Sequence, residues 1–553
     1  MSGAVGEDRR VGTTTATEPT ETAAPLRPSQ RVRLPVQLPR AFDVIAVALL
    51  GIGAYVARRG SLPSDGLWFD DSWVAAGAML GSPRQLLVVG SGHPGFTAIL
   101  MAVDRIGGGD LTHLGVPSLV FGVLAPAALY LVLRSFGYAR AISAIVSAAL
   151  VVAPIPILYS GRVKGYTLDT LVVLVLAVAV PVLARRTWRW PVAVAWTIAA
   201  IGISSLSAYT LLATAGAGVI LLLHPRADRG LRIAAVGVQA VVQGAYLTVA
   251  QSKSDLAGIE EVMEKVYDGH MTFSWNPLTF GEEVLKHLRR LAEVYPGSPG
   301  DDRWWLALLA LLSMAGLVIA AVRGRRRSEA LAARYLLLLV LVAAGGSLLE
   351  RFPFGPSNEV PLSAGGRHTL WMVPALALGL AALAQRARAF IADRDPLRLG
   401  VDALVVTVAV AMVVVAYEPA RAAPFPGSAS AARFVDASVG LHDVVVVTSP
   451  STFSFAISGT TPVRVHATPD HQVGFAPVYL DRRVKNVGRW AVAPGSPAQV
   501  RSWTADADRV FVLTAGPVGG PSRENLRAVL ESQGFTSSET MRFGSNTVDV
   551  YRG

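Results

Sequence analysis

Two adjacent acids, Asp70 and Asp71, follow the first membrane-length apolar run of the chain. Trp68 and Trp73 flank them, and tryptophan favours the interface between a bilayer and water. A carboxylate is costly to keep near hydrocarbon, so this pair indicates a function. It could take a proton from a hydroxyl nucleophile, bind a sugar hydroxyl or bind a divalent cation such as Mg²⁺ or Mn²⁺. The alternative is that Asp70 or Asp71 is a solvated loop acid or caps a helix over 72–80.

A second group of polar residues joins two later apolar runs. It contains Tyr159, Arg162, Lys164, Tyr166 and Asp169. Two cations with tyrosine neighbours at the outer end of two predicted spans suit a lipid-linked phosphate. Asp169 lies about one turn into the next apolar run, where an isolated carboxylate is expensive, so we expect it to pair with Arg162 or Lys164. The alternative is a purely structural salt bridge.

Further candidate residues lie elsewhere in the predicted outer loops. Arg351, Arg367 and His368 stand between two late apolar runs, and the arginines suit either a phosphate clamp or contact with lipid headgroups. His93 precedes a short apolar segment over 94–106. A single histidine is more often structural than a ligand, and no H-x-x-H zinc spacing occurs.

Composition indicates a membrane protein. Of 553 residues, 52% are hydrophobic and 16% are charged, against about 25% charged in a soluble domain. The chain has no cysteine, which excludes disulfides, thiolate metal sites and a cysteine nucleophile. The formal charge is +11, and much of it is arginine in short loops between apolar runs. This pattern favours positive-inside membrane topology over nucleic-acid binding.

A membrane span needs about 20 mostly apolar residues, and the chain offers eleven candidates. They cover 41–57, 114–133, 141–158, 166–183, 190–206, 209–223, 233–249, 304–322, 331–349, 370–383 and 401–417. The segment 94–106 is too short and charged to count, so we expect a helix in the outer interface there. Eleven spans place the arginine-rich loops and the N-terminus in the cytoplasm, and the C-terminus outside.

The spans divide the chain into three parts. Residues 1–39 are predicted to be a disordered cytoplasmic tail, and residues 40–420 a transmembrane domain with outer loops at 58–113 and 251–302. Residues 424–553 alternate strand-like and helix-like runs, which predicts a small extracytoplasmic α/β domain. Its strands are expected at 443–448, 463–466, 509–513 and 548–551, and its helices at 430–438 and 521–533.

These features together resemble the GT-C class of polyprenyl-phosphate-sugar-dependent glycosyltransferases, in particular family 39 with its protein-mannosyltransferase and aminoarabinose-transferase relatives. That class carries an acid pair between tryptophans in its first outer loop, a His-Pro element after it, a Tyr-Ser…Arg turn and a late Gly-x-Arg-His segment. The matching residues here are 68–73, 93–95, 159–168 and 351–368. The second acid here is Asp where the family often has Glu, and Gly95 replaces the second proline.

The resemblance implies a GT-C fold and inverting transfer of a sugar from a polyprenyl-phosphate donor to a cell-envelope acceptor, at the outer face of a bacterial plasma membrane. Asp70 would be the general base, and Asp71 would orient the acceptor or bind a cation. The donor phosphate would contact Arg162, Lys164, Arg367, Arg351, Tyr159 and Tyr166, while His93, Asp169 and His368 would position substrates. The composition is typical of a high-GC bacterium, which makes arabinofuranose or mannose plausible sugars. The alternatives are a transporter or flippase of lipid-linked substrates and a non-catalytic scaffold with the same fold.

Overall fold

The computed structural model describes residues 41–90, 93–225, 227–251, 270–295, 304–350, 354, 365–391, 427–467, 475–487, 497–515 and 520–553. The predictions for the N-terminal tail, for Arg351, for the span at 401–417 and for much of the loop at 251–302 therefore lie outside the described residues.

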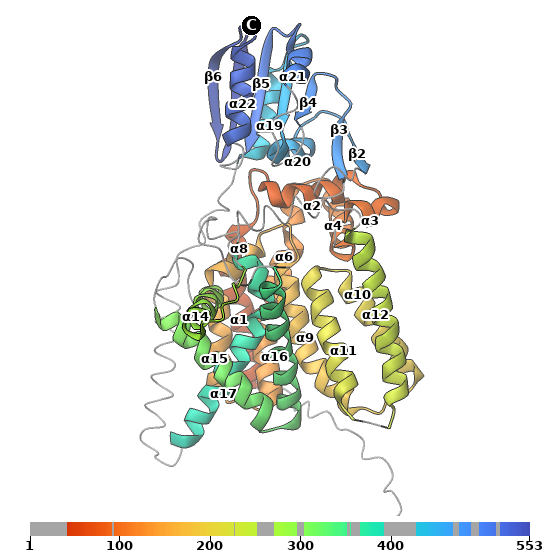
Figure 1. Cartoon of the computed structure of the whole chain (residues 1–553), viewed down its shortest axis with the longest axis vertical. Coiled ribbons are helices and arrows are strands. Elements are labelled where there is room, and N and C mark those ends of the chain that lie inside the picture. Colours follow the sequence, from red (N-terminus) through yellow and green to blue (C-terminus); the bar gives the residue numbers. More distant parts are fainter. Residues whose placement is uncertain are drawn as a thin grey trace, which may run out of the picture. The chain divides into compact units, whose positions relative to one another are not determined.

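Helices make up the described chain as far as residue 391 (Figure 1). The longer helices are α1 (Ala41–Arg58), α2 (Phe69–Leu80), α4 (Pro94–Gly107), α6 (Val116–Phe136), α7 (Arg140–Val152), α9 (Tyr166–Arg185), α10 (Trp190–Ser204), α11 (Ala208–Leu223), α12 (Arg229–Gln251), α14 (Pro277–Val294), α15 (Trp304–Arg323), α16 (Arg327–Leu348) and α17 (Val373–Ile391). The short ones are α3 (Leu86–Val89), α5 (Leu111–Leu114) and α8 (Pro154–Ser160), with 3₁₀ turns η1 (Arg59–Ser61), η2 (Pro83–Gln85) and η3 (Gly365–Met372).

Ten of the eleven predicted spans coincide with apolar helices. Seven helical segments in the described chain are long and apolar enough to cross a membrane, and the bent pair α7–α8 brings the number to eight. Helices α10 and α11 fall short of that length, with 15 and 16 residues. The segment at 94–106 forms α4, a helix of 14 residues that packs against α2.

The bend between α7 and α8 has a specific cause. Pro154 has no N–H to donate to the carbonyl of Leu150. The buried guanidinium of Arg58 donates to that carbonyl at 2.7 Å and to the carbonyl of Val151 at 2.8 Å. Its Nε also donates to Ser160 Oγ at 3.1 Å. The end of α1 therefore fixes the turn from which α8 leads into the polar loop.

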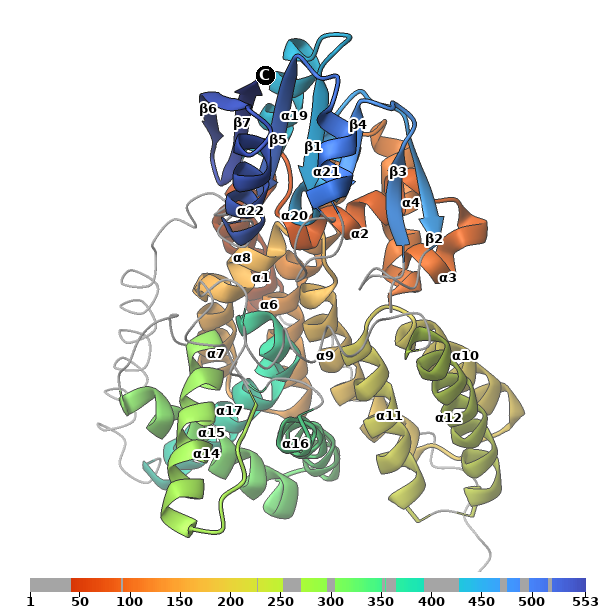
Figure 2. The same ribbon diagram turned by 45° about the horizontal axis from the view of Figure 1, so that its top comes forward.

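The C-terminal region forms the expected α/β structure. Its sheet has the order β4-β1-β5-β7-β6, in which β4, β1 and β5 are parallel and β7 and β6 are antiparallel (Figure 2). The strands are β1 (Val444–Thr448), β4 (Val484–Val487), β5 (Arg509–Ala515), β6 (Thr536–Phe543) and β7 (Asn546–Arg552), and a separate hairpin pairs β2 (Val463–Ala467) with β3 (Phe475–Tyr479). The helices are α19 (Ser428–Ser438), α20 (Ser449–Ser458), α21 (Pro497–Thr504) and α22 (Gly520–Glu531).

The continuous valine run of β1 follows from burial on both faces of the sheet. Val445 and Val447 pack with residues of α19 and α20, while Val444 and Val446 pack with residues of α21 and α22. A strand covered on both faces reads as a continuous apolar run without alternation. Four predicted strands and both predicted helices of this region are present, whereas β3, β4, β6, α20 and α21 were not predicted.

Candidate active site

The acid pair lies in the first turn of α2. Trp68 is the N-cap residue of this helix, and its carbonyl accepts hydrogen bonds from the N–H groups of Asp71 and Ser72, both at 2.9 Å. The prediction that Asp70 or Asp71 caps the helix is therefore wrong. Both carboxylates instead stand beside the unpaired N–H groups of a helix start, where negative charge is stabilised. Because the side chains are not used for capping, they are available to partners from other segments.

The loop between α8 and α9 brings two cations to the acids. Its backbone is fixed by Ser118 of α6, whose hydroxyl donates to the carbonyl of Lys164 at 2.6 Å. Thr167 in turn donates to the carbonyl of Ser118 at 2.9 Å. Gly161 lies so close to Ser61 that an added Cβ would be 1.8 Å from the Ser61 carbonyl oxygen. This tight approach holds the loop against the end of α1 and explains the glycine.

Each acid is paired with a different arginine. Arg162 Nη1 lies 3.2 Å from Asp71 Oδ2, and both side chains are almost fully buried. Arg367, in η3, forms an ion pair with Asp70 through its Nη1 atom. The partners are 91 and 297 residues apart in the sequence, so the fold assembles this site from three distant segments.

The rings of two tryptophans lie against the three cations of the site. The Arg162 guanidinium carbon lies 4.4 Å from the ring centre of Trp68, and that of Arg367 lies 5.9 Å from the same ring. Lys164 Nζ lies 3.8 Å from the ring centre of Trp73. The Arg162–Trp68 and Lys164–Trp73 distances are typical of cation–π attraction, which is strongest where water is excluded. From the sequence, these tryptophans were expected to lie at the membrane interface and to flank the acid pair, but not to contact the cations.

Burial and the neighbouring charges change the pKa values of the acids and of Lys164 in this site. Burial acts to raise the pKa of Asp70, but the positive charges of Arg367 and Lys164 outweigh burial and lower that pKa to about 2. Burial raises the pKa of Asp71 despite Arg162 and Lys164. Burial lowers the pKa of Lys164 to about 8, against the opposing effect of both acids. At neutral pH Asp70 is therefore ionised and most of Lys164 is protonated.

The three cations exceed the two acids in charge, and the site retains unused hydrogen-bond donors. Arg162 is 2% exposed, and its Nε and Nη2 atoms have no hydrogen-bond partner among the described residues. A buried guanidinium donor without a partner is costly. The arrangement can therefore accept an anion, and the planar fork of arginine suits a phosphate.

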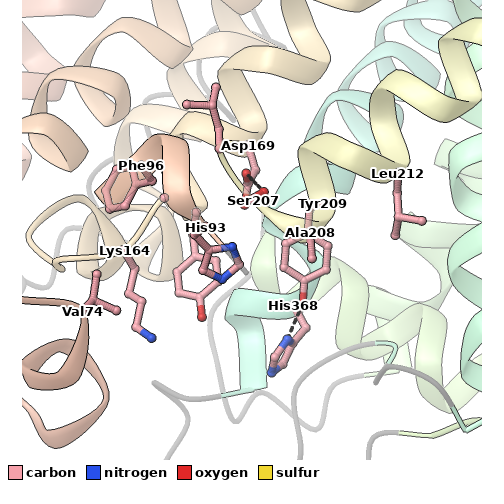
Figure 3. A pocket seen from close by; sticks show the side chains of 13 residues that line it. Val74, His93, Phe96, Lys164, Asp169, Ser207, Ala208, Tyr209, Leu212 and His368 are labelled. Atoms are coloured by element: carbon pink, nitrogen blue, oxygen red, sulfur yellow. Dashed lines mark hydrogen bonds between the residues drawn. The ribbon is translucent and has the colours of Figure 1, made fainter. Parts of the chain in front are cut away.

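A cavity of about 270 Å³ lies beside these charges (Figure 3). Lys164, Tyr166, Asp169, His93 and His368 line it, all of them predicted site residues. Ser207, Tyr209, Phe96 and Leu212 contribute to its wall as well, and sequence reasoning had not singled them out. A space of this size is at the small end of ligand pockets, whose volumes are about 300–1,000 Å³.

Two hydrogen bonds organise the polar side of the cavity. Asp169 accepts a hydrogen bond from the Ser207 hydroxyl, so the prediction that it pairs with Arg162 or Lys164 is wrong for the described residues. Ser207 is the N-cap of α11 and lies at the break between α10 and α11.

Tyr209 is hydrogen-bonded to His368 Nδ1, and Arg367 Nε donates to His368 Nε2 at 3.1 Å. This bond makes Nε2 an acceptor and places the ring proton on Nδ1. His368 thereby connects the arginine of the acid pair to the cavity wall.

The structure also places three of the remaining predicted residues, Tyr159, Tyr166 and His93. The rings of Tyr159 and Tyr166 meet edge to face, with centres 5.2 Å apart, and Arg162 lies 5.9 Å from the ring centre of Tyr159. His93 precedes α4 and faces the cavity. Arg351 lies outside the described residues.

The side chains of the site include few ligands for a metal ion. No group of three or more His, Asp or Glu side chains is placed to hold a metal within the part of the chain that the structure describes. Both carboxylates that we considered as ligands, those of Asp70 and Asp71, face guanidinium groups. The residues present thus fit an anion better than a divalent cation.

The apolar helices and the C-terminal α/β region together form a GT-C glycosyltransferase fold, as expected. The fold is similar to that of ArnT from Cupriavidus metallidurans, an aminoarabinose transferase. The apo structure of ArnT aligns over 92% of this chain and 97% of its own, with a TM-score of 0.50 and 12% identity. The structure of ArnT bound to undecaprenyl phosphate aligns over 92% and 98%, with a TM-score of 0.51 and 13% identity. At this identity the likeness establishes the fold alone. No protein-family model and no curated protein matches the sequence.

Proposed function

We propose that this protein is a membrane glycosyltransferase that moves a sugar from a polyprenyl-phosphate donor to a hydroxyl group of a cell-envelope acceptor. The observation that carries the proposal is the group of three buried cations, Arg162, Lys164 and Arg367, around the acid pair. Such a group binds a phosphate and stabilises the charge that it gains as a leaving group. The undecaprenyl phosphate bound to the similar fold of ArnT supports a lipid-linked phosphate as the ligand.

Asp70 is the proposed general base. It is the more exposed acid, at 14% against 4% for Asp71, and its low pKa keeps it ionised at neutral pH. The acceptor oxygen attacks the anomeric carbon as its proton passes to Asp70. The bond between that carbon and the phosphate oxygen breaks, and the electron pair leaves with the phosphate. Attack opposite the leaving group inverts the anomeric configuration.

Asp71 is the proposed partner that holds Arg162 in place, because the two side chains are buried together at 3.2 Å. The proposed place of the donor sugar is the cavity lined by Tyr166, Asp169 and His368. Tyr159 lies beside Arg162, and His93 lines the same cavity as Lys164.

We further propose a multi-pass protein of a bacterial plasma membrane. The N-terminus is then cytoplasmic, and the acid pair and C-terminal domain lie outside. The seven or eight apolar segments support the membrane location, and the arginine-rich loops support the orientation.

The test is transfer by the purified full-length protein in lipid, with radiolabelled decaprenyl-phosphate arabinose and mannose as donors and a cell-envelope fraction as acceptor. Wild type should transfer label, and Asp70→Asn should lose at least 100-fold in rate, since a positioned base contributes about 10²–10⁴-fold. Asp110→Asn is the matched control, because Asp110 is an exposed acid in the same loop that caps α5. Transfer by Asp70→Asn at the wild-type rate would exclude Asp70 as the base, and absence of transfer with every donor would favour a transporter or scaffold.

A further inference from the structure

The loop that leads to the acid pair is bonded to the first residues of α19 in the C-terminal domain. Ser428 Oγ accepts a hydrogen bond from the backbone N–H of Leu67 at 3.0 Å and lies 3.2 Å from the Leu67 carbonyl, to which it can donate. The N–H of Gly427 donates to the carbonyl of Asp65 at 2.8 Å. Ser428 and Leu67 are both 3% exposed, so water does not replace these bonds.

The same contact has a side-chain component and a close backbone approach. The Asp65 carboxylate accepts from Ser430 Oγ at 2.8 Å and from Arg433 at 3.0 Å. Gly66 has a φ of +97°, and an added Cβ would lie 2.0 Å from Ser428 Oγ. A residue with a side chain at this position would therefore be strained and would also push α19 away.

The bonded segment leads directly into the site. Leu67 precedes Trp68, whose carbonyl begins α2 and whose ring lies under Arg162 and Arg367. A displacement of Leu67 would move both the first turn that carries Asp70 and the ring that supports the two guanidinium groups. The bonds from Ser428 are made to the backbone of Leu67, the residue directly before Trp68.

A second contact holds α2 from the same domain. Helix α20 packs against α2, and Phe453 of α20 and Phe475 of β3 belong to the same buried apolar cluster as Val74 and Ala78 of α2. The C-terminal domain thus contacts the acid-bearing helix and also the residues just before it.

We propose that Ser428 and Asp65 are positioning residues: through them the C-terminal domain sets the place of Asp70 and Trp68 for the transfer reaction. The inference rests on the proposed function, and it assigns to the C-terminal domain a part in catalysis. A positioning role affects the chemical step more than donor binding, because the three proposed phosphate-binding cations lie in other segments, the α8–α9 loop and η3.

The experiment compares Ser428→Ala and Asp65→Ala with two matched controls. Asp65→Asn keeps an acceptor for Ser430, and Ser532→Ala removes an exposed hydroxyl of the same domain that donates to the carbonyl of Val529. We expect kcat to fall about 10- to 100-fold in both alanine variants, with KM for the donor within about twofold of wild type. Both controls should keep a kcat near that of wild type.

Hydrogen exchange of the segment 65–72 gives a readout that does not depend on activity. Removal of the Ser428 hydroxyl should speed exchange of the Leu67 amide, since that amide loses its acceptor. Unchanged exchange in folded Ser428→Ala, or a wild-type kcat in both alanine variants, would overturn the inference. Absence of transfer by wild type would instead count against the proposed function, and faster exchange would still support the contact.

Discussion

Substitution of Arg162 by glutamine tests whether the unused donors of the site bind a phosphate. Arg162 has one bond to Asp71 and two buried nitrogen atoms, Nε and Nη2, without a hydrogen-bond partner among the described residues. If these two atoms bind the donor phosphate, Arg162→Gln loses two charge-assisted bonds. Each is worth about 1.5–3 kcal/mol, and 1.4 kcal/mol corresponds to tenfold, so affinity should fall about 10²–10⁴-fold.

The substitution also leaves a buried carboxylate without its partner. Breaking a buried ion pair on one side costs about 3–5 kcal/mol of stability. The raised pKa of Asp71 lets this acid take up a proton, so we expect a loss near the lower end. The double variant Asp71→Asn/Arg162→Gln removes the carboxylate as well and should recover most of the stability without recovering phosphate affinity.

The assay is binding of undecaprenyl phosphate to protein in nanodiscs at pH 7, with thermal unfolding measured on the same samples. Arg527→Gln is the control, since Arg527 is an exposed arginine that pairs with Glu531 on α22. If the folded double variant binds undecaprenyl phosphate as tightly as wild type, Arg162 does not contact the phosphate and the argument from its unused donors is refuted.

Three further predictions concern the loop and its supports. Affinity for undecaprenyl phosphate should fall by about tenfold or more as the pH rises through 8, because Lys164 loses its proton there. Lys164→Arg should abolish this fall. Binding measured from pH 6 to 10 would test both expectations. Gly161→Ala should lower the unfolding temperature, because its Cβ would lie 1.8 Å from a backbone carbonyl oxygen, while Gly202→Ala, with open space around it, should not. Arg58→Met should lower the free energy of unfolding by about 1–3 kcal/mol for each buried carbonyl left unpaired, as denaturant titration would show, whereas exposed Arg59→Met should change little.

The resemblance to the GT-C class placed Asp70, Asp71, Arg162, Lys164 and Arg367 in one site, but the sequence did not predict how they pair. Acids and cations at the edge of apolar runs are costly alone, so a common site is the expected solution. The pairs Asp70–Arg367 and Asp71–Arg162 join segments far apart in the chain, and local patterns carry no information on which arginine meets which acid. The capping preference of aspartate was overridden because both carboxylates are used in these pairs.

Asp169 shows a second limit of local reasoning. Its position inside an apolar helix correctly indicated a buried carboxylate in need of a partner. The nearest cations in the sequence, Arg162 and Lys164, are instead engaged with the acid pair, and the partner is Ser207 at the break between α10 and α11. In the C-terminal region, the buried strands β1 and β5 were predicted from their apolar runs, whereas the exposed edge strand β6 has a polar sequence without such a signal.

The pairing of the acids with arginines has a consequence for the proposed mechanism. Three buried cations would repel one another without the two carboxylates, so the acids stabilise the site before the donor binds. In the proposed mechanism the donor phosphate would compete with Asp70 for Arg367, and this competition would strengthen as the leaving phosphate gains negative charge. If Arg367 turned toward the phosphate, its effect on the Asp70 carboxylate would weaken and the pKa of Asp70 would rise from about 2. Asp70 would then become a stronger base during the step in which the acceptor hydroxyl loses its proton, which would link departure of the phosphate to activation of the nucleophile.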